Sequence, residues 1–216
     1  MKRGLLISSL VTLLLGSWSM AFALITVNEN ASTAANGQIL SFGGSGTQAN
    51  PYVLVEELYV PDYTIDFHGM PGHGNPAQTG HSTGFWLKKQ VINKTGVAWS
   101  SFDNELQQIF GTPSPDTDGL SFAQGFLPRP FSSDLLPLWT EVFTVRDFVN
   151  FYGGSVGVDQ TLTMYMIITD NSPIDPFYLR QRPNLPPPGV PEPATMLLLG
   201  CGLIGLAGYG RKKLLK

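Results

Sequence analysis

Alternation of apolar and polar side chains runs through the middle of the chain and predicts β-strands. The clearest case is residues 161–170, where Leu162, Met164, Met166 and Ile168 alternate with threonine and tyrosine side chains. A period of two places one set of side chains in a core and the other towards solvent, as in a half-buried strand. Further segments rich in aromatic and β-branched residues are predicted strands at 53–60, 85–93 and 177–182.

Turn signals separate these segments at Gly153-Gly154 and at residues 112–115 and 171–173. Residues 102–110 carry apolar side chains on roughly one helical face, and residues 135–151 fit either a strand or a short helix. The chain has many short strands and frequent turns, without regular alternation of strands and helices. This pattern predicts an all-β fold, an antiparallel β-sandwich of jelly-roll or immunoglobulin-like type, over residues 24–182.

The N-terminal 23 residues have the three parts of a secretory signal peptide. Lys2 and Arg3 precede an apolar run at residues 5–15, and Ala21 and Ala23 supply small side chains for signal peptidase. We expect a short signal helix, cleavage after Ala23 and export by the Sec route. The alternatives are cleavage after Ala21 and an uncleaved anchor, and the short apolar run argues against the anchor.

The C-terminal residues have the pattern of a membrane helix with a cytoplasmic tail. Residues 194–210 contain no charged side chain, and a helix of this length reaches about 25 Å, enough for a thin bilayer. The basic residues that follow act as a membrane stop and place the tail, residues 211–216, in the cytoplasm; they begin with Arg211, Lys212 and Lys213. A Pro-rich linker at residues 183–189 argues against the alternative of a buried core helix.

Charge is segregated along the chain. The formal net charge is −3, but the residues between positions 24 and 190 include seven basic and 15 acidic side chains, so this middle part carries −8. Such a balance excludes a broadly basic nucleic-acid binder. Because the chain has one cysteine, an intrachain disulfide framework is excluded. This residue, Cys201, lies in the predicted membrane helix.

The residues just before the predicted membrane helix carry a specific motif. Val190, Pro191, Glu192 and Pro193 precede a Gly-rich apolar helix and a terminal basic cluster, and residues 190–216 thereby resemble the PEP-CTERM sorting signal of Gram-negative bacteria. The resemblance implies recognition by exosortase, a membrane-embedded transpeptidase-like enzyme thought to cleave near the motif. It also implies a transient anchor in the inner membrane, a final place at the cell surface or outside the cell, and association with exopolysaccharide and biofilm.

Two segments of the middle part resemble the β-sandwich ectodomains of PEP-CTERM proteins. Residues 91–102 are similar to their Asn-x-Thr-Gly…Trp…Phe segment, and residues 177–183 to their closing strand, with tyrosine at position 178 where threonine is usual. We expect Asn93 and Gly96 to form a turn after a strand, and Trp99 and Phe102 to anchor the core.

Three local patterns resemble motifs that carry chemistry. Residues 80–84 satisfy G-x-S-x-G, but no histidine follows His81 and the next residues predict a strand, so an α/β-hydrolase is rejected. His68, His73 and His81 are candidate metal ligands, but their spacing fits no metal motif and favours a solvated loop, so we predict no metal site. Residues 116–119 contain two aspartates, yet Asp-Gly turns are common without calcium.

The tryptophans at positions 86, 99 and 139 could form a sugar-stacking platform, but core packing is the favoured interpretation. No paired acidic motif or complete triad points to an enzyme. The sequence therefore predicts a non-catalytic exported protein without a cofactor, whose partners are signal peptidase, exosortase, the inner membrane and exopolysaccharide. The alternatives are a carbohydrate-binding module for the cell's own polysaccharide and a secreted hydrolase.

Overall fold

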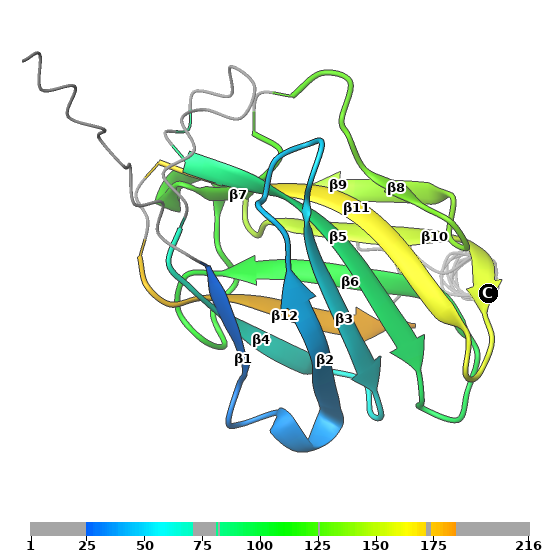
Figure 1. Cartoon of the computed structure of the whole chain (residues 1–216). Helices are drawn as coiled ribbons and strands as arrows, with labels where there is room; N and C mark the ends of the chain where they lie inside the picture. The colour runs from blue at the N-terminus through cyan, green and yellow to red at the C-terminus, as the bar shows by residue number, and fades with distance from the viewer. Residues whose placement is uncertain (1–24, 71–80, 82, 125, 172–173, 185–216) are drawn as a thin grey trace, which may run out of the picture.

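The computed structural model of the protein describes residues 25–70, 81, 83–124, 126–171 and 174–184 (Figure 1). In these ranges the helices are single 3₁₀ turns, η1 (Ala34–Asn36) and η2 (Asp116–Asp118). No helix within the described ranges has the length and apolar character needed to cross a membrane. The predicted signal helix and the predicted membrane helix at 194–210 lie outside the described residues.

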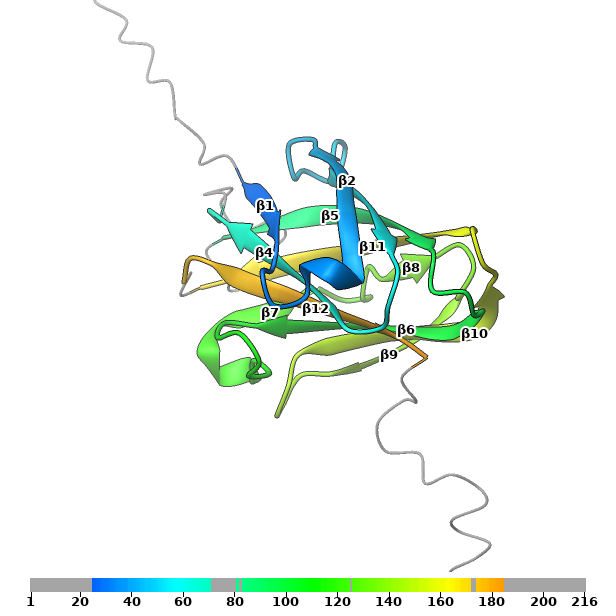
Figure 2. The ribbon, with the colours of Figure 1, turned by 90° about the horizontal axis from the view of Figure 1, so that it is seen from below.

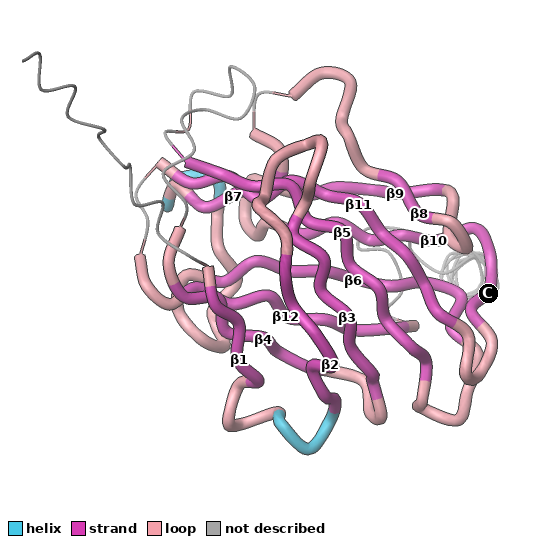
Figure 3. The backbone as a smooth tube through the Cα atoms, in the orientation of Figure 1, coloured by secondary structure: helices cyan, strands magenta, loops and turns pink. Residues whose placement is uncertain are grey.

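The described strands form two sheets (Figure 3). Sheet A has the strand order β1 (Thr26–Glu29), β4 (Tyr63–His68), β12 (Phe177–Pro183), β6 (Trp99–Gln107), β10 (Phe148–Val156) and β9 (Leu138–Val142). Sheet B has the order β2 (Gly37–Gly43), β3 (Tyr52–Leu58), β5 (Thr83–Asn93), β11 (Thr161–Asp170) and β7 (Leu120–Phe122), with β8 (Ser132–Ser133) paired to β11.

The two sheets pack face to face around one apolar core, and this arrangement confirms the predicted β-sandwich (Figure 2). Aromatic rings fill one end of the core, where Phe67 of sheet A stacks on Phe177 of sheet A at 5.0 Å and on Phe85 of sheet B at 6.0 Å. All three side chains are almost completely buried. Burial of each ring contributes about 1.5–3 kcal/mol, which is how a domain without disulfides holds its sheets together.

One strand pair departs from the antiparallel prediction. β3 and β5 run parallel, with Tyr52 opposite Leu87 and Leu58 opposite Asn93. The reason is the chain path: after β3 the chain crosses to sheet A as β4 and then returns to sheet B as β5. Such a crossing brings the second strand in with the same direction as the first, whereas a hairpin would reverse it.

The strands predicted from alternation are confirmed. β11 spans the predicted residues 161–170, and β3, β5 and β12 cover most of the other three predicted segments. On β11, Leu162, Met164, Met166 and Ile168 are all buried, as expected.

The helical interpretation of residues 102–110 was wrong. These residues belong largely to β6, which is hydrogen-bonded between β12 and β10. From Ser101 to Gln107 both faces of β6 are buried, so the strand shows no clean alternation of polar and apolar residues. Residues 135–151, whose pattern fits either a strand or a short helix, contain β9 and the start of β10.

Gly153-Gly154 does not form the predicted turn but a bulge inside β10. The pairing with β6 shifts register between Tyr152 and Val156, and Gly153 has a φ of 86°. A Cβ at Gly154 would lie 1.9 Å from the carbonyl oxygen of Leu135, so only glycine fits there. The turn signal at 112–115 is confirmed, since it follows β6 as a loop.

The turn after β5 explains the Asn-x-Thr-Gly…Trp segment in physical terms. The Asn93 side chain donates to the carbonyl of Val97 at 2.8 Å and accepts hydrogen bonds from the backbone and hydroxyl of Thr95. The Thr95 hydroxyl in turn accepts from Trp99 Nε1 at 2.9 Å. Gly96 has a φ of 77°, and Trp99 is fully buried, as is Phe102. The predicted turn and core anchors are confirmed.

Candidate functional site

A polar triad lies in the middle of the apolar core, where Lys89 of β5, Glu56 of β3 and Gln181 of β12 are completely buried. Lys89 Nζ is 2.8 Å from Glu56 Oε1, and Gln181 Nε2 donates to Glu56 Oε2 at 3.0 Å. Lys89 Nζ also donates to Gln181 Oε1 and lies 4.5 Å from the centre of the Phe102 ring. The triad therefore connects sheet B to sheet A through side chains.

Burial changes the acid–base behaviour of this lysine. Loss of solvent around the ammonium lowers the pKa of Lys89 to about 8, although the nearby Glu56 carboxylate opposes the shift. A lysine with a pKa of about 8 has a larger neutral, nucleophilic fraction at neutral pH than an exposed lysine. Chemically, the triad combines an amine, a carboxylate and an amide.

A second group of polar side chains lies on the outer face of sheet A, the face directed away from the core. We call it the charged cluster, and it consists of Asp103, Glu105, Arg146, Arg180, Arg182 and Asp62. The strand register places Asp103 beside Arg182 and Glu105 beside Arg180. Because side chains alternate along a strand and Gln181 faces the core, its neighbours Arg180 and Arg182 face outward.

The two carboxylates of β6, Asp103 and Glu105, form ion pairs with guanidinium groups. Arg182 Nη2 bonds Asp103 at 2.7 Å and Glu105 at 2.8 Å, and Arg146 Nη2 bonds Glu105 at 2.7 Å. Burial raises the pKa of Asp103, and its contacts with Arg182 and Arg146 oppose that shift. Both carboxylates are therefore paired with the guanidinium groups of Arg146 and Arg182.

A small hollow of about 220 Å³, the Phe110 hollow, lies at the end of the charged cluster. Its walls include the ion pair of Arg180 with Asp62, the Gln107 side chain and the Phe110 ring. Phe110 is 41% exposed and meets the Tyr178 ring edge-on at 5.6 Å. Hydrogen bonds from Arg180 hold the pKa of Asp62 below its ordinary value. The hollow thus combines an exposed aromatic ring with planar polar groups.

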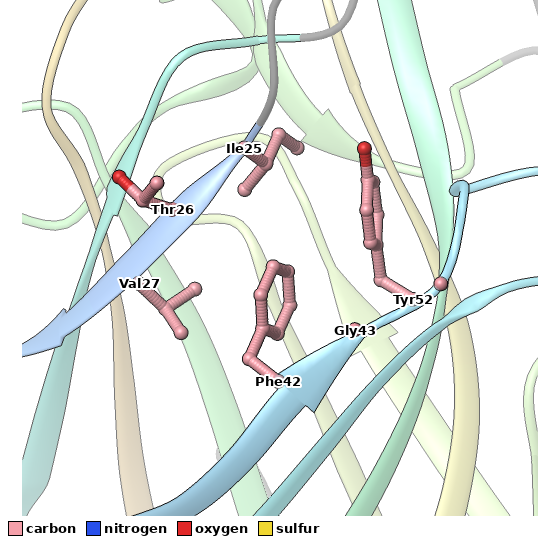
Figure 4. Close-up of a pocket in the computed structure, with 7 residues that line it drawn as sticks. Ile25, Thr26, Val27, Phe42, Gly43 and Tyr52 are labelled. Atoms are coloured by element: carbon pink, nitrogen blue, oxygen red, sulfur yellow. The ribbon is translucent and has the colours of Figure 1, made fainter.

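An apolar hollow of about 290 Å³ opens between the edge strands β1 and β2. In Figure 4 the side chains of Ile25, Val27, Phe42 and Tyr52 converge on this space, whereas Thr26 points away from it. Burial raises the pKa of the Tyr52 hydroxyl. The lining offers contact area for an apolar group, and no carboxylate or imidazole belongs to it.

The candidate histidines are not gathered into a metal site in the described part of the chain. His68 Nδ1 is 3.3 Å from Asp175 Oδ1, His81 is buried rather than solvated as expected, and His73 lies outside the described residues. Within the described ranges, no group of three His, Cys, Asp or Glu side chains is placed to hold a metal ion.

The remaining patterns have structural roles where they are described. β5 begins at Thr83, inside the G-x-S-x-G match, and the residues after the match continue this strand, as expected. Asp118 Oδ1 accepts from the Leu120 backbone at 3.1 Å and caps a turn. Trp86 and Trp139 are partly buried and pack against Phe126 and Phe131.

The sequence predictions missed the triad and the charged cluster. A signal for the triad was available, because Lys89 occupies an apolar position in the alternation of β5, and Glu56 does so in β3. The predicted signal-cleavage residues Ala21 and Ala23 lie outside the described residues. So do the predicted sorting motif Val190–Pro193 and the membrane stop, residues 211–213.

Comparison with known protein families supplies the finding about the C-terminus. Residues 189–212 match the PEP-CTERM protein-sorting motif, which confirms the resemblance noted from the sequence. Neither the curated proteins nor the solved structures give a match to this chain.

Proposed function

We propose that the β-sandwich is a non-catalytic component of the cell surface or extracellular matrix, exported and then processed by exosortase. The PEP-CTERM sorting motif at residues 189–212 supports targeting to exosortase. In this proposal signal peptidase removes residues 1–23 after Sec export. Exosortase then recognises Val190, Pro191, Glu192 and Pro193 and releases the domain from the inner membrane.

The motif itself supports this order of events. Proline disfavours a helix at and before its own position, so in this proposal Pro191 and Pro193 keep the motif accessible to an enzyme. In this proposal Glu192 supplies one negative charge outside the membrane, and the positive charges of Arg211, Lys212 and Lys213 set the depth of the expected helix. Pro183 ends β12 and therefore belongs to the domain, and we propose that the rest of the predicted linker, up to residue 189, is a spacer between the domain and the membrane.

The domain's chemistry supports a structural role. Six of the seven basic side chains between residues 24 and 190 form ion pairs with the domain's own carboxylates. The carboxylates in excess give this part of the chain its charge of −8, which favours solubility and repels anionic polymers unless cations bridge them. Association with exopolysaccharide and biofilm belongs to this proposal.

A pair of charge-removing variants tests the role of the motif. Glu192→Ala should leave the protein in the inner-membrane fraction, whereas Asp159→Ala, which removes an exposed carboxylate on the domain, should leave release unchanged. The measurement is the distribution of protein between membrane, surface and medium in a host with exosortase. Equal release of both variants would show that Glu192 is not part of the recognised signal.

One observation favours carbohydrate binding as a second function. The Phe110 hollow offers an exposed aromatic ring next to planar polar side chains, a combination that suits the apolar and hydroxyl faces of a sugar. Its volume is about 220 Å³, below the range of about 300–1,000 Å³ usual for drug-sized ligands, and suits a single sugar unit of a polymer.

Binding of purified protein to the producing cell's polysaccharide tests this second function. Phe110→Ala should abolish retention, while Ile109→Ala, at an exposed neighbour that does not line the hollow, should retain it. Equal retention of the two variants would remove the hollow from consideration.

A further inference from the structure

We propose that Lys89 and Gln181 react to form an intramolecular isopeptide bond, with Glu56 as the proton-transfer group. The bond would join Lys89 Nζ to Gln181 Cδ and cross-link the two sheets covalently. This inference rests on the buried triad alone and does not depend on processing at the C-terminus.

The geometry brings the reacting groups into contact. Lys89 Nζ donates a hydrogen bond to Gln181 Oε1, and this oxygen is bonded directly to the electrophilic Cδ. Glu56 bridges the two partners, with Oε1 at 2.8 Å from Lys89 Nζ and Oε2 at 3.0 Å from Gln181 Nε2. One carboxylate therefore contacts both the attacking nitrogen and the leaving nitrogen. Such prior positioning can replace much of the entropy cost of a reaction between free groups.

The surroundings favour the neutral amine. All three side chains are fully buried, and the Phe102 ring faces Lys89 Nζ at 4.5 Å. Burial lowers the pKa of Lys89 to about 8. Exclusion of water also strengthens the electrostatic interactions of the carboxylate with the developing charges and suppresses hydrolysis of the amide.

The reaction balances without a further reactant. Glu56 takes a proton from the Lys89 ammonium, and the neutral Nζ attacks Gln181 Cδ. Glu56 then returns its proton to Nε2 as the Cδ–Nε2 bond breaks. Nζ releases a second proton and keeps one, so the products are a secondary amide, ammonia and one proton, which leave together as ammonium. No oxidant or reductant is consumed, and Glu56 ends as a carboxylate.

The cross-link would replace the stabilisation that disulfides give to other exported proteins. The sole cysteine of the chain is Cys201, so residues 25–184 contain none. β12 is the last strand before the Pro-rich residues, and the bond ties it to β5 in the other sheet. A load applied at the C-terminal side of the domain would then pass into both sheets.

Mass spectrometry of the folded wild-type protein tests the proposal directly. We expect an intact mass lower by one ammonia than the mass calculated for the same termini. We also expect a proteolytic branched peptide that joins Lys89 to Gln181, with no tryptic cleavage after Lys89. Recovery of both segments as separate, unmodified peptides would overturn the proposal.

Two other side chains carry groups that could form an amide bond with Lys89, and mass spectrometry distinguishes each of these bonds from a bond to Gln181. Asn104 lies opposite Gln181 in the strand register, and its Oδ1 accepts no hydrogen bond within the described residues. A bond to Asn104 would also release ammonia but would give a different branched peptide, and a bond to Glu56 would release water instead. Either outcome would overturn the assignment to Gln181.

Variants separate the roles of the three groups. Glu56→Gln keeps the shape of the side chain but cannot accept the proton, and we expect it to retain the full mass, as Lys89→Met should. Lys88→Met is the matched control, because Lys88 is half-buried on the other face of β5 and contacts Tyr165. It should lose ammonia like the wild type. Loss of ammonia from Glu56→Gln at the wild-type rate would exclude Glu56 as the proton acceptor.

Discussion

Removal of Arg182 tests how far the charged cluster stabilises sheet A. Asp103 and Glu105 are at most 1% exposed, and Arg182 bonds both of them. Removing one partner from a buried ion pair costs about 3–5 kcal/mol, since the remaining charge stays buried. Arg146 still reaches both carboxylates, at 3.2 and 2.7 Å. We therefore expect Arg182→Ala to cost about 3 kcal/mol, the lower end of that range.

Thermal unfolding followed by circular dichroism measures this loss. For a domain of this size, 1 kcal/mol corresponds to about 2–4 °C in Tm, so Arg182→Ala should lower Tm by roughly 6–12 °C. Lys94→Ala is the matched control, because its ion pair with Asp159 is exposed and screened by solvent, and its Tm should stay close to that of the wild type. Asp103→Asn in the Arg182→Ala background should recover part of the loss. Equal Tm values for Arg182→Ala and Lys94→Ala would refute the reasoning.

Three further predictions concern the turn, the bulge and the surface ion pair. Thr95→Val removes the hydroxyl that accepts a hydrogen bond from Trp99 Nε1 and leaves the indole N–H unpaired. In a denaturant titration the free energy of unfolding should fall by about 1–3 kcal/mol, and an unchanged midpoint would contradict the role given to the hydroxyl. Gly154→Ala should destabilise by several kcal/mol or prevent folding, since its Cβ would overlap a backbone oxygen, and a wild-type Tm would rule out the bulge as described. Asp62→Asn should be less stable than the wild type at neutral pH, because Arg180 lowers the pKa of Asp62 in the folded state. The difference in stability should shrink as the pH falls below 3.8, the ordinary pKa of the group. A difference independent of pH would exclude the ion pair of Asp62 with Arg180 as its source.

The sequence predicted the fold class best where one face of a strand is buried and the other is not. β11 is such a strand over its first half, and its predicted limits agree with the structure. β6 is buried on both faces, because Arg146 and Arg182 cover its outward carboxylates. For that reason β6 shows no regular alternation of polar and apolar side chains. The apolar side chains of residues 102–110 instead have the spacing of one face of a helix. The parallel pairing of β3 with β5 depends on a chain crossing between sheets, which no local pattern records.

The triad could be predicted only in part. The alternation of β5 places Lys89 among apolar side chains, which marks it as unusual. Its partners are Glu56 on another strand of the same sheet and Gln181, 92 residues away on the other sheet. Their meeting depends on strand order and on sheet packing, and a single sequence contains neither. By contrast, the Asn93 turn is local, so its residues could be predicted from one segment.

The most direct test of the central claim is the C-terminal mass of the exported protein from cells with and without exosortase. With exosortase present, we predict a chain that ends near the motif at Val190–Pro193 and lacks residues 194–216. Without exosortase, the membrane fraction should hold a chain that still ends at Lys216. An exported protein that retains residues 211–216 in the presence of exosortase would contradict the account.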